Sequence, residues 1–357
     1  MRLSRLEVRN LRILEAVTLA PEGGINLILG DNGSGKTSLL EAVHLLGTGR
    51  SFRARGADTL IRRGESELMV YGGVLEPDGA AFPIGVEKGL RSTRIRLDQS
   101  EVRNATALAR RLPMVLVPPD SQRLLTDGAD LRRRLLDWGL FHVEPSYAEV
   151  HQQYRRVLQQ RNAQLRNRPS PSAMAAWSRE IQQAGERLSQ LRSAHLGRML
   201  PSVSAFMSQL LLFEVSIHYR QGWDESKDLA QALRDCTARD LARGHTTVGP
   251  HRADLGFTVN GTPAQHRLSR GEAKLFCLAV WLAQAQDFYA HAARWPLLLI
   301  DDLAAELDAE NRRRVFETLE KLGAQVFVTA LSKTAVEGLS ATGKSFHVER
   351  GKVVEMV

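Results

Sequence analysis

Cysteine is scarce in this sequence, and long apolar runs are missing. Only Cys236 and Cys277 occur among 357 residues, which suggests neither a disulfide framework nor a metal site and is typical of a reducing compartment. No apolar run reaches the roughly 18 residues of a membrane-spanning helix. The stretch MRLSRLEVRN is too charged for a secretory signal. We therefore expect a soluble, cytoplasmic protein with no membrane partner.

The charge balance is basic. Lys and Arg number 48 against 40 Asp and Glu, giving a formal net charge of +8. Neutralising phosphates releases counterions, so such a balance favours a polyanionic partner, most simply nucleic acid. Many basic proteins bind no nucleic acid, and the charge alone does not decide the matter.

Three zones follow one another along the chain. Residues 1–120 contain short strand-like runs bounded by Gly, Pro and Asp, namely LEVRNL, INLILG, LMVYGGVL, FPIGVEK, TRIRLD and MVLVPPD. Residues 121–240 read as helical, and residues 241–357 return to strand-like runs, with a closing hairpin in SFHVERGKVVEM. The sequence therefore predicts an α/β fold whose β-rich core is split by an inserted helical arm.

The arm is predicted to be a short antiparallel helical hairpin. Apolar residues recur at helical spacing before and after the break RPSPS at 168–172, at Tyr147, Val150, Tyr154, Val157, Leu165, Trp177, Ile181, Ala184, Leu188 and Leu191. Two such seams bury each other when the helices pair. His195 lies on the same seam, and we expect it to be a packing residue rather than a metal ligand.

The strongest motif is a phosphate-binding loop. It matches G-x-x-x-x-G-K-[ST] at every fixed position and lies between the strand-like INLIL and a helix expected from Lys36 to Leu46. Its glycines let backbone N–H groups point at phosphates, Lys36 adds a positive charge, and Thr37 offers a hydroxyl to Mg²⁺. The predicted nucleotide-binding residues are Gly30, Asp31, Asn32, Gly33, Ser34, Gly35, Lys36, Thr37 and Ser38.

Two acids follow a second buried strand. In PLLLIDD an apolar run ends at Asp301 and Asp302, as expected where a parallel strand meets a ligand at its carboxyl end. We expect Asp301 to hold Mg²⁺ together with Thr37, and Asp302 to orient the attacking water. Lys36, Asp301 and Asp302 are thus the predicted catalytic residues.

A third motif is RLSRGEAKLF, residues 267–276. Alone it is a serine-capped helix start. The order of phosphate loop, LSRGE, double acid and Glu306-Leu307-Asp308 resembles the ABC-type ATPases. That resemblance implies that Ser269 and Gly271 face a nucleotide bound by a second copy of the chain, so that ATP is held between two subunits and its hydrolysis releases them.

Further stretches resemble the RecF family of bacterial recombination mediators and cover nearly the whole chain. They are VRNLRILEAVTL, GTGRSFRARGADTLIRRG, MVLVPPDSQRLLTDGADLRRRLLDWGLFHVEPSY, TTVGPHRADLGFTVNG, LSRGEAKLF and LLLIDDLAAELD. The resemblance implies an ABC-type ATPase head that binds ATP and Mg²⁺ and dimerises on ATP. It also implies binding to gaps or junctions of single- and double-stranded DNA, and cooperation with RecR and RecO to load RecA.

Two positions bear on how fast such a protein hydrolyses ATP, and a third on how it binds the nucleotide. Asp302 stands where many ABC relatives carry Glu, and Thr329 stands where a histidine is expected. A hydroxyl is a poor proton acceptor, so we expect a weak, DNA-dependent ATPase used as a switch. Arg12 lies where related ATPases place an arginine near the nucleotide.

DNA contacts are predicted among several arginines, with a solvated surface as the alternative for each. The candidates are Arg50, Arg53, Arg55, Arg62, Arg63, the run Arg132–Arg133–Arg134 and the arginines of YRRVLQQRNAQLRNR. Phosphate contacts carry little sequence information, so we expect recognition by shape. His251 and Arg252 are interpreted as a connection between the arm and the ATPase core.

Other function classes fit less well. A transport ATPase subunit would place its signature much nearer to the phosphate loop, and a nuclease with an ATPase head would need a further cluster of acids. A chromosome-organising SMC protein would carry a far longer coiled coil than this hairpin. The predicted division is therefore residues 1–120 and 241–357 as the two halves of the ATPase domain, with residues 121–240 as the arm.

Overall fold

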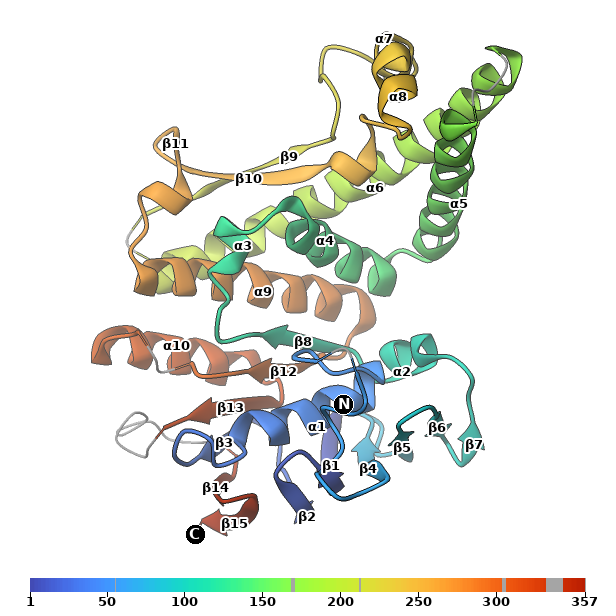
Figure 1. The fold of residues 1–357 in the computed structure, drawn as a ribbon. Coiled ribbons are helices and arrows are strands. Elements are labelled where there is room, and N and C mark those ends of the chain that lie inside the picture. The colour runs from blue at the N-terminus through green and yellow to red at the C-terminus, as the bar shows by residue number, and fades with distance from the viewer. Residues whose placement is uncertain (55, 168–170, 212, 304–305, 332–342, 357) are drawn as a thin grey trace. The chain divides into compact units, whose positions relative to one another are not determined.

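The computed structural model describes residues 1–54, 56–167, 171–211, 213–303, 306–331 and 343–356 (Figure 1). They form two compact units, Met1–Ser121 with Phe288–Val357, and Gln122–Asp287. None of the described helices has both the length and the apolar character needed to cross a lipid bilayer.

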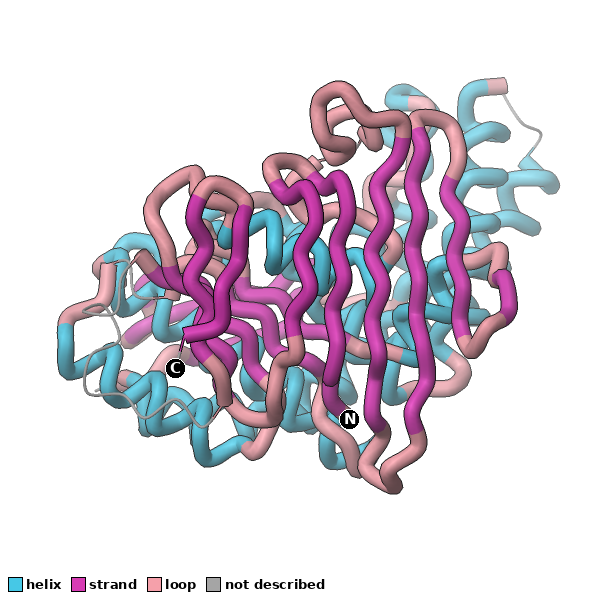
Figure 2. Tube along the Cα trace, turned by 90° about the horizontal axis from the view of Figure 1, so that it is seen from below, coloured by secondary structure: helices cyan, strands magenta, loops and turns pink. Residues whose placement is uncertain are grey.

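The first unit contains an antiparallel sheet that Figure 2 shows face-on. Its strand order is β2-β1-β4-β5-β6-β7. Most of its strands alternate between buried and more exposed residues, as expected of a sheet with one face on the core. The strands are β1 (Arg2–Leu11), β2 (Leu14–Leu19), β4 (Glu67–Leu75), β5 (Ala81–Gly89), β6 (Thr93–Leu97) and β7 (Ser100–Glu101).

The second sheet of this unit is mostly parallel. Its strand order is β15-β14-β3-β13-β12-β8, and only β14 and β15 pair antiparallel. Strands β3, β12 and β13 are buried at every residue, which explains why their sequences are apolar except at Asn26 and Thr329. The strands are β3 (Ile25–Leu29), β8 (Met114–Val117), β12 (Leu297–Ile300), β13 (Val326–Ala330), β14 (Ser345–Glu349) and β15 (Lys352–Met356).

Helix α1 (Lys36–Thr48) packs against strands of both sheets. Its Leu39, Leu40, Val43 and Leu46 are fully buried in one core with residues of both sheets, and each such side chain stabilises the fold by about 1.5–3 kcal/mol. Helices α2 (Ala105–Arg111) and α10 (Ala309–Leu322) complete the unit. The core therefore surrounds the helix that follows the phosphate loop.

The second unit contains the predicted hairpin. Helices α5 and α6 pack against each other through Tyr154, Val157, Ile181 and Leu188, all buried. The residues between them, 168–170, lie outside the described residues. The helices of this unit are α3 (Arg123–Thr126), α4 (Ala129–Val143), α5 (Tyr147–Arg166), α6 (Pro171–Leu210), α7 (Leu229–Asp235), α8 (Thr237–Arg243) and most of α9 (Arg270–Ala292).

This unit also holds a small sheet that the sequence did not predict. Strands β9 (Ser216–Arg220), β10 (Asp254–Val259) and β11 (Thr262–Pro263) pair antiparallel, and the 3₁₀ turns Pro250–Arg252 and Ala264–His266 flank β10 and β11. By contacts, residues 241–287 group with the preceding arm residues rather than with the strands that follow them. That residues 241–357 form one half of the ATPase domain remains a prediction.

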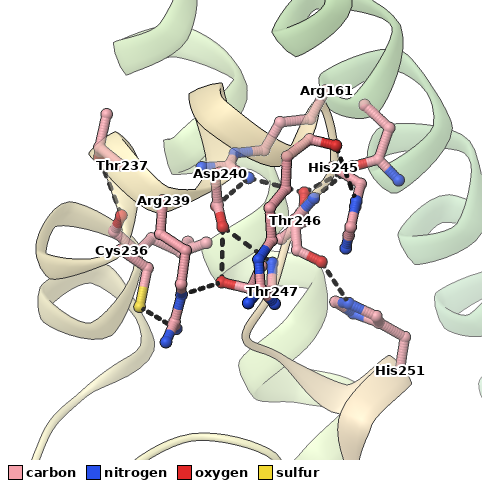
Figure 3. A network of polar contacts seen from close by, with 12 residues as sticks. Arg161, Cys236, Thr237, Arg239, Asp240, His245, Thr246, Thr247 and His251 are labelled. Carbon is pink, nitrogen blue, oxygen red and sulfur yellow. Dashed lines mark hydrogen bonds and ion pairs between the residues drawn. The ribbon is translucent and has the colours of Figure 1, made fainter.

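A buried polar network joins α5 to the segment after α8, as Figure 3 shows. Arg161 and Asp240 are fully buried and pair at 2.8 Å. Arg161 also donates to the Thr246 hydroxyl at 2.6 Å, and Asp240 accepts from the backbone N–H and hydroxyl of Thr247. His251 donates from Nε2 to the Thr246 carbonyl and accepts from the Tyr154 hydroxyl at Nδ1, 2.6 Å away. The His251–Tyr154 pair thus ties the 3₁₀ turn to the hairpin.

Asp240→Ala should unfold the second unit at a lower urea concentration. The change leaves the Arg161 guanidinium buried without its counter-charge, at a cost of about 3–5 kcal/mol. Far-ultraviolet circular dichroism during urea unfolding measures the effect. The matched control is Lys227→Ala, which removes an exposed pair with Asp235 in the same unit and should change little. Equal midpoints for the two variants would contradict the role given to the buried pair.

Candidate functional site

The phosphate loop joins β3 to α1 with backbone that only glycine adopts readily. Gly33 and Gly35 have φ values of 77° and 119°, in the left-handed region. At Gly30, a Cβ atom would lie 2.2 Å from the Val348 carbonyl oxygen. The glycine positions of the motif are therefore required by conformation and by the strand β14 beside the loop.

Lys36 occupies the inside of this loop. Its ammonium donates to the carbonyls of Gly30 at 2.6 Å and Asp31 at 2.8 Å. Burial lowers the pKa of Lys36, while the carboxylates of Asp302 and Asp301 oppose that shift. The Ser34 hydroxyl is buried and has no hydrogen-bond partner among the described residues. The loop thus presents a cation and a buried hydroxyl for which an anion is a suitable partner.

Asp301 connects the second acidic motif to the loop. Its Oδ1 accepts from the Thr37 hydroxyl at 3.1 Å and from the Thr329 hydroxyl at 2.6 Å. Strands β3, β13 and β12 are parallel neighbours, so their carboxyl ends meet at one edge of the sheet. Residues that are 264 positions apart in the sequence are thereby in direct contact.

Asp302 adopts the left-handed conformation, with φ 53°. Its backbone N–H donates to the Thr329 hydroxyl at 2.7 Å. Thr329 therefore bridges both acids, accepting from Asp302 and donating to Asp301. Thr329 stands where a histidine was expected, and in this arrangement it connects the two acids.

Thr37 and Asp301 fit a magnesium ion. Both present hard oxygen atoms, and those atoms lie 3.1 Å apart. Mg²⁺ prefers one or two protein oxygens together with waters and phosphate oxygens. Burial raises the pKa of Asp301, against the hydrogen bonds from Thr329 and Thr37, which lower it. A divalent cation would remove the cost of that buried carboxylate.

These groups line one cavity of about 340 Å³. From the loop and α1 it is lined by Asn32, Gly33, Gly35, Lys36, Thr37 and Ser38. The other walls come from Asp301, Asp302, Thr329, Arg12, Arg53 and Pro119. Apart from Gly30, Asp31 and Ser34 of the loop, every residue of the first unit predicted for nucleotide or magnesium binding or for catalysis therefore lines the cavity.

Arg12 reaches the cavity from the turn between β1 and β2. It has a left-handed φ of 52°, and its backbone N–H donates to the Leu60 carbonyl at 2.7 Å. Its guanidinium binds both carboxylate oxygens of Glu41, at 2.5 and 3.1 Å. The sequence did not single out Glu41. The available signal was a charged residue with apolar neighbours on both sides in the helix TSLLEAVHLL.

Ser269 and Gly271 lie in the second unit, at the start of α9. The Ser269 hydroxyl and backbone N–H both donate to Glu272, at 2.7 and 2.8 Å. This is a capping box, in which a carboxylate binds the donors at a helix N-terminus. Both Ser269 and Glu272 make these bonds near the surface. The capped helix start predicted from the sequence is therefore present.

Two of the arginines considered for DNA binding are buried in ion pairs, and that hypothesis is wrong for them. Arg132 donates to both oxygens of Asp254, and Arg161 pairs with Asp240. Buried guanidinium groups in such pairs are not available to phosphates. Arg62 pairs with Glu15 nearer the surface, and Arg53 lines the cavity. Arg55 and Arg168 lie outside the described residues.

His195 is fully buried, with Nδ1 3.3 Å from Asp287. A Cβ atom on Gly139 would lie 2.1 Å from its Nε2, so the imidazole packs directly on that glycine. Among the described residues, no group of three or more His, Cys, Asp or Glu is placed to hold a metal ion.

Comparison with known proteins gives the family. The RecF/RecN/SMC N-terminal domain model matches residues 2–353. A relative from Stutzerimonas stutzeri is 41% identical, covering 100% of this chain and 98% of its own, and one from Vibrio parahaemolyticus is 38% identical, covering 99% of each. Both are called DNA replication and repair protein RecF. The chain belongs to the RecF family.

Solved structures agree with this assignment. The structure of a recombination mediator protein RecF with ATPrS, in the RecFOR pathway, has a TM-score of 0.86 and 25% identity, covering 100% of this chain and 98% of its own. An Smc head bound to the C-winged helix domain of ScpA has a TM-score of 0.63 and 16% identity, covering 100% of this chain and 98% of its own. That second likeness concerns the fold alone. The predicted ABC-type head with its split core and helical arm is therefore confirmed.

Asp301→Asn should stabilise the nucleotide-free protein at neutral pH. Folding raises the pKa of this carboxyl group above its value in the unfolded chain. The group therefore lowers the stability of the fold increasingly as the pH rises from the unfolded pKa through the folded one. Asparagine removes the charge but keeps an oxygen acceptor for Thr37 and Thr329. Scanning calorimetry without nucleotide or magnesium should show a higher melting temperature than the parent.

The pH dependence provides the control. The difference between the Asp301→Asn variant and the parent should shrink towards zero below the ordinary pKa of aspartate, where the parent is uncharged in both states. A variant that melts below the parent at neutral pH would show that the buried charge is not what destabilises this edge of the sheet.

Proposed function

We propose that this protein is an ATP-dependent DNA-binding protein of recombinational repair. It binds Mg²⁺ and ATP in the 340 Å³ cavity, dimerises on ATP and recognises gapped DNA or junctions of single- and double-stranded DNA. With RecR and RecO it assists the loading of RecA. The observation that carries the proposal is the meeting of Lys36, Thr37 and Asp301 in one cavity.

The chain's own residues supply most of the binding chemistry. Lys36 would exchange the carbonyls of Gly30 and Asp31 for phosphate oxygens, and the N–H groups at the start of α1 would bind the same phosphates. Thr37 and Asp301 would hold Mg²⁺, which supplies charge neutralisation at the phosphates. Two solved relatives are described as RecF with ATP or with ATPrS, which supports the binding of a nucleotide.

Slow hydrolysis follows from the groups next to the phosphates. Asp302 would orient the attacking water, with its position fixed by the bond from its N–H to Thr329. The Thr329 hydroxyl is already shared between the two acids, and it is a poor proton acceptor. Hydrolysis would then set the lifetime of the ATP-bound dimer rather than serve a metabolic reaction.

The second copy would contribute α9. Glu272 now accepts hydrogen bonds from Ser269 at the positive end of that helix. A γ-phosphate on the partner copy would replace this carboxylate as the anion at the helix start. The capping box thus keeps the helix end satisfied until a nucleotide is presented.

Ser269→Arg should separate binding from dimerisation. The bulky side chain blocks access to the start of α9 but leaves the cavity of the same chain unchanged. The monomer should bind ATP with the parent's affinity by calorimetry, while ATP should no longer produce a dimer in analytical ultracentrifugation.

Lys36→Met is the matched variant for the cavity itself. It should lose ATP binding and, with it, the dimer. Loss of ATP binding by the Ser269→Arg monomer would contradict the role of Ser269, and parent-like binding by Lys36→Met would contradict the nucleotide site.

A further inference from the structure

Glu41 is a fully buried carboxylate in the first unit, one turn along α1 from the phosphate loop. Its neighbours in the helix, Leu39, Leu40, Ala42 and Val43, are apolar and fully buried. A carboxylate in such surroundings costs several kcal/mol unless it is paired and hydrogen-bonded. Its partners therefore indicate why the helix carries a charge here.

The first partner is Arg12. Two guanidinium nitrogens, Nε and Nη2, bind the two carboxylate oxygens of Glu41, the bidentate geometry in which such pairs are strongest. Arg12 is 22% exposed at its side chain, whereas Glu41 is 0% exposed, so the pair points from the core towards the cavity that Arg12 lines. A third nitrogen, Nη1, donates to the Thr59 carbonyl at 3.3 Å.

The second partner is Ser51. Its hydroxyl donates to the same carboxylate and accepts from the backbone N–H groups of Arg53 and Ala54, at 2.9 and 2.8 Å. These bonds fix the turn that carries Arg53, which also lines the cavity. One buried carboxylate is thus connected to both arginines that line the cavity.

We infer that Glu41 is a positioning residue for the nucleotide. It holds Arg12 directly and Arg53 through Ser51, so that both cations are in place before the phosphates arrive. A cation ordered in advance loses less conformational entropy on binding than one that must be recruited from solvent. This inference rests on the proposed function, because it assigns the cavity's two arginines to the phosphates of ATP.

The arrangement also explains the backbone of Arg12. A non-glycine residue at φ 52° carries a cost of roughly 1–2 kcal/mol. The ion pair with Glu41 and the N–H bond to Leu60 compensate for it. The turn between β1 and β2 is therefore held in a conformation that serves the side chain of Arg12.

Glu41→Gln should lower the affinity for ATP in the presence of Mg²⁺ by about tenfold, the size expected for one charge-assisted contact. Arg12→Gln should lower it by a similar or smaller factor, because it leaves the connection of Glu41 to Arg53 intact. Because Glu41 acts through Arg12 and, by way of Ser51, through Arg53, the variant that combines both changes should be little weaker than Glu41→Gln alone. Calorimetry on the whole chain at concentrations below dimer formation measures all three. Glu310→Gln, which removes an exposed acid paired with Arg313, is the control and should bind like the parent.

Two outcomes would overturn the inference: parent-like affinity in a folded Glu41→Gln variant, or independent losses that multiply to about a hundredfold in the double variant. If Glu41→Gln does not fold, Ser51→Ala tests the same connection. It leaves the Arg12 pair intact and should weaken ATP binding several-fold by releasing Arg53, and unchanged binding would overturn the inference. Equal binding by the parent and by Lys36→Met would instead reject the nucleotide site itself.

Discussion

The candidate site of the first unit is organised around one carboxylate oxygen that accepts hydrogen bonds from two hydroxyls. Asp301 accepts from Thr37 at the start of α1 and from Thr329 at the end of β13. These contacts connect the carboxyl ends of three buried parallel strands. Those strands are mainly apolar on both faces, and the polar residues of the candidate site lie at or just beyond their carboxyl ends. Each of these groups has a partner there, and we propose that a nucleotide and a cation would bind the same groups.

Charge burial at this edge has an energetic consequence. Lys36, Asp301 and Glu41 are all buried, with exposures of 9%, 2% and 0%. For Glu41 the ion pair with Arg12 compensates the desolvation, whereas burial shifts the pKa values of Lys36 and Asp301, whose partners offset the cost only in part. Groups of this kind favour a bound ligand that supplies the missing charge. We therefore expect reduced stability of the free protein at the edge where the proposed phosphate and divalent cation would bind.

Much of this site could be predicted from the sequence because its functional residues occur in short contiguous motifs. The loop from Gly30 to Thr37 is one contiguous segment, and so is the pair of acids after LLLI. The strands that precede them have the apolar character of buried parallel strands. Glu41 was not predicted because its partners, Arg12 and Ser51, come from separate segments whose meeting depends on the tertiary fold. Arg132 and Arg161 failed as surface candidates for the same reason, since Asp254 and Asp240 lie far along the chain.

The central claim is that ATP, held by the loop and the acids, joins two copies of the chain, and that DNA binding follows. Sedimentation velocity without nucleotide, with ADP and with ATP, each with and without gapped DNA, tests it most directly. The account predicts a monomer without nucleotide or with ADP, a dimer with ATP and Mg²⁺, and association with gapped DNA that is strongest with ATP. A dimer that forms equally in all three nucleotide states, or a monomer that persists with ATP, would contradict it.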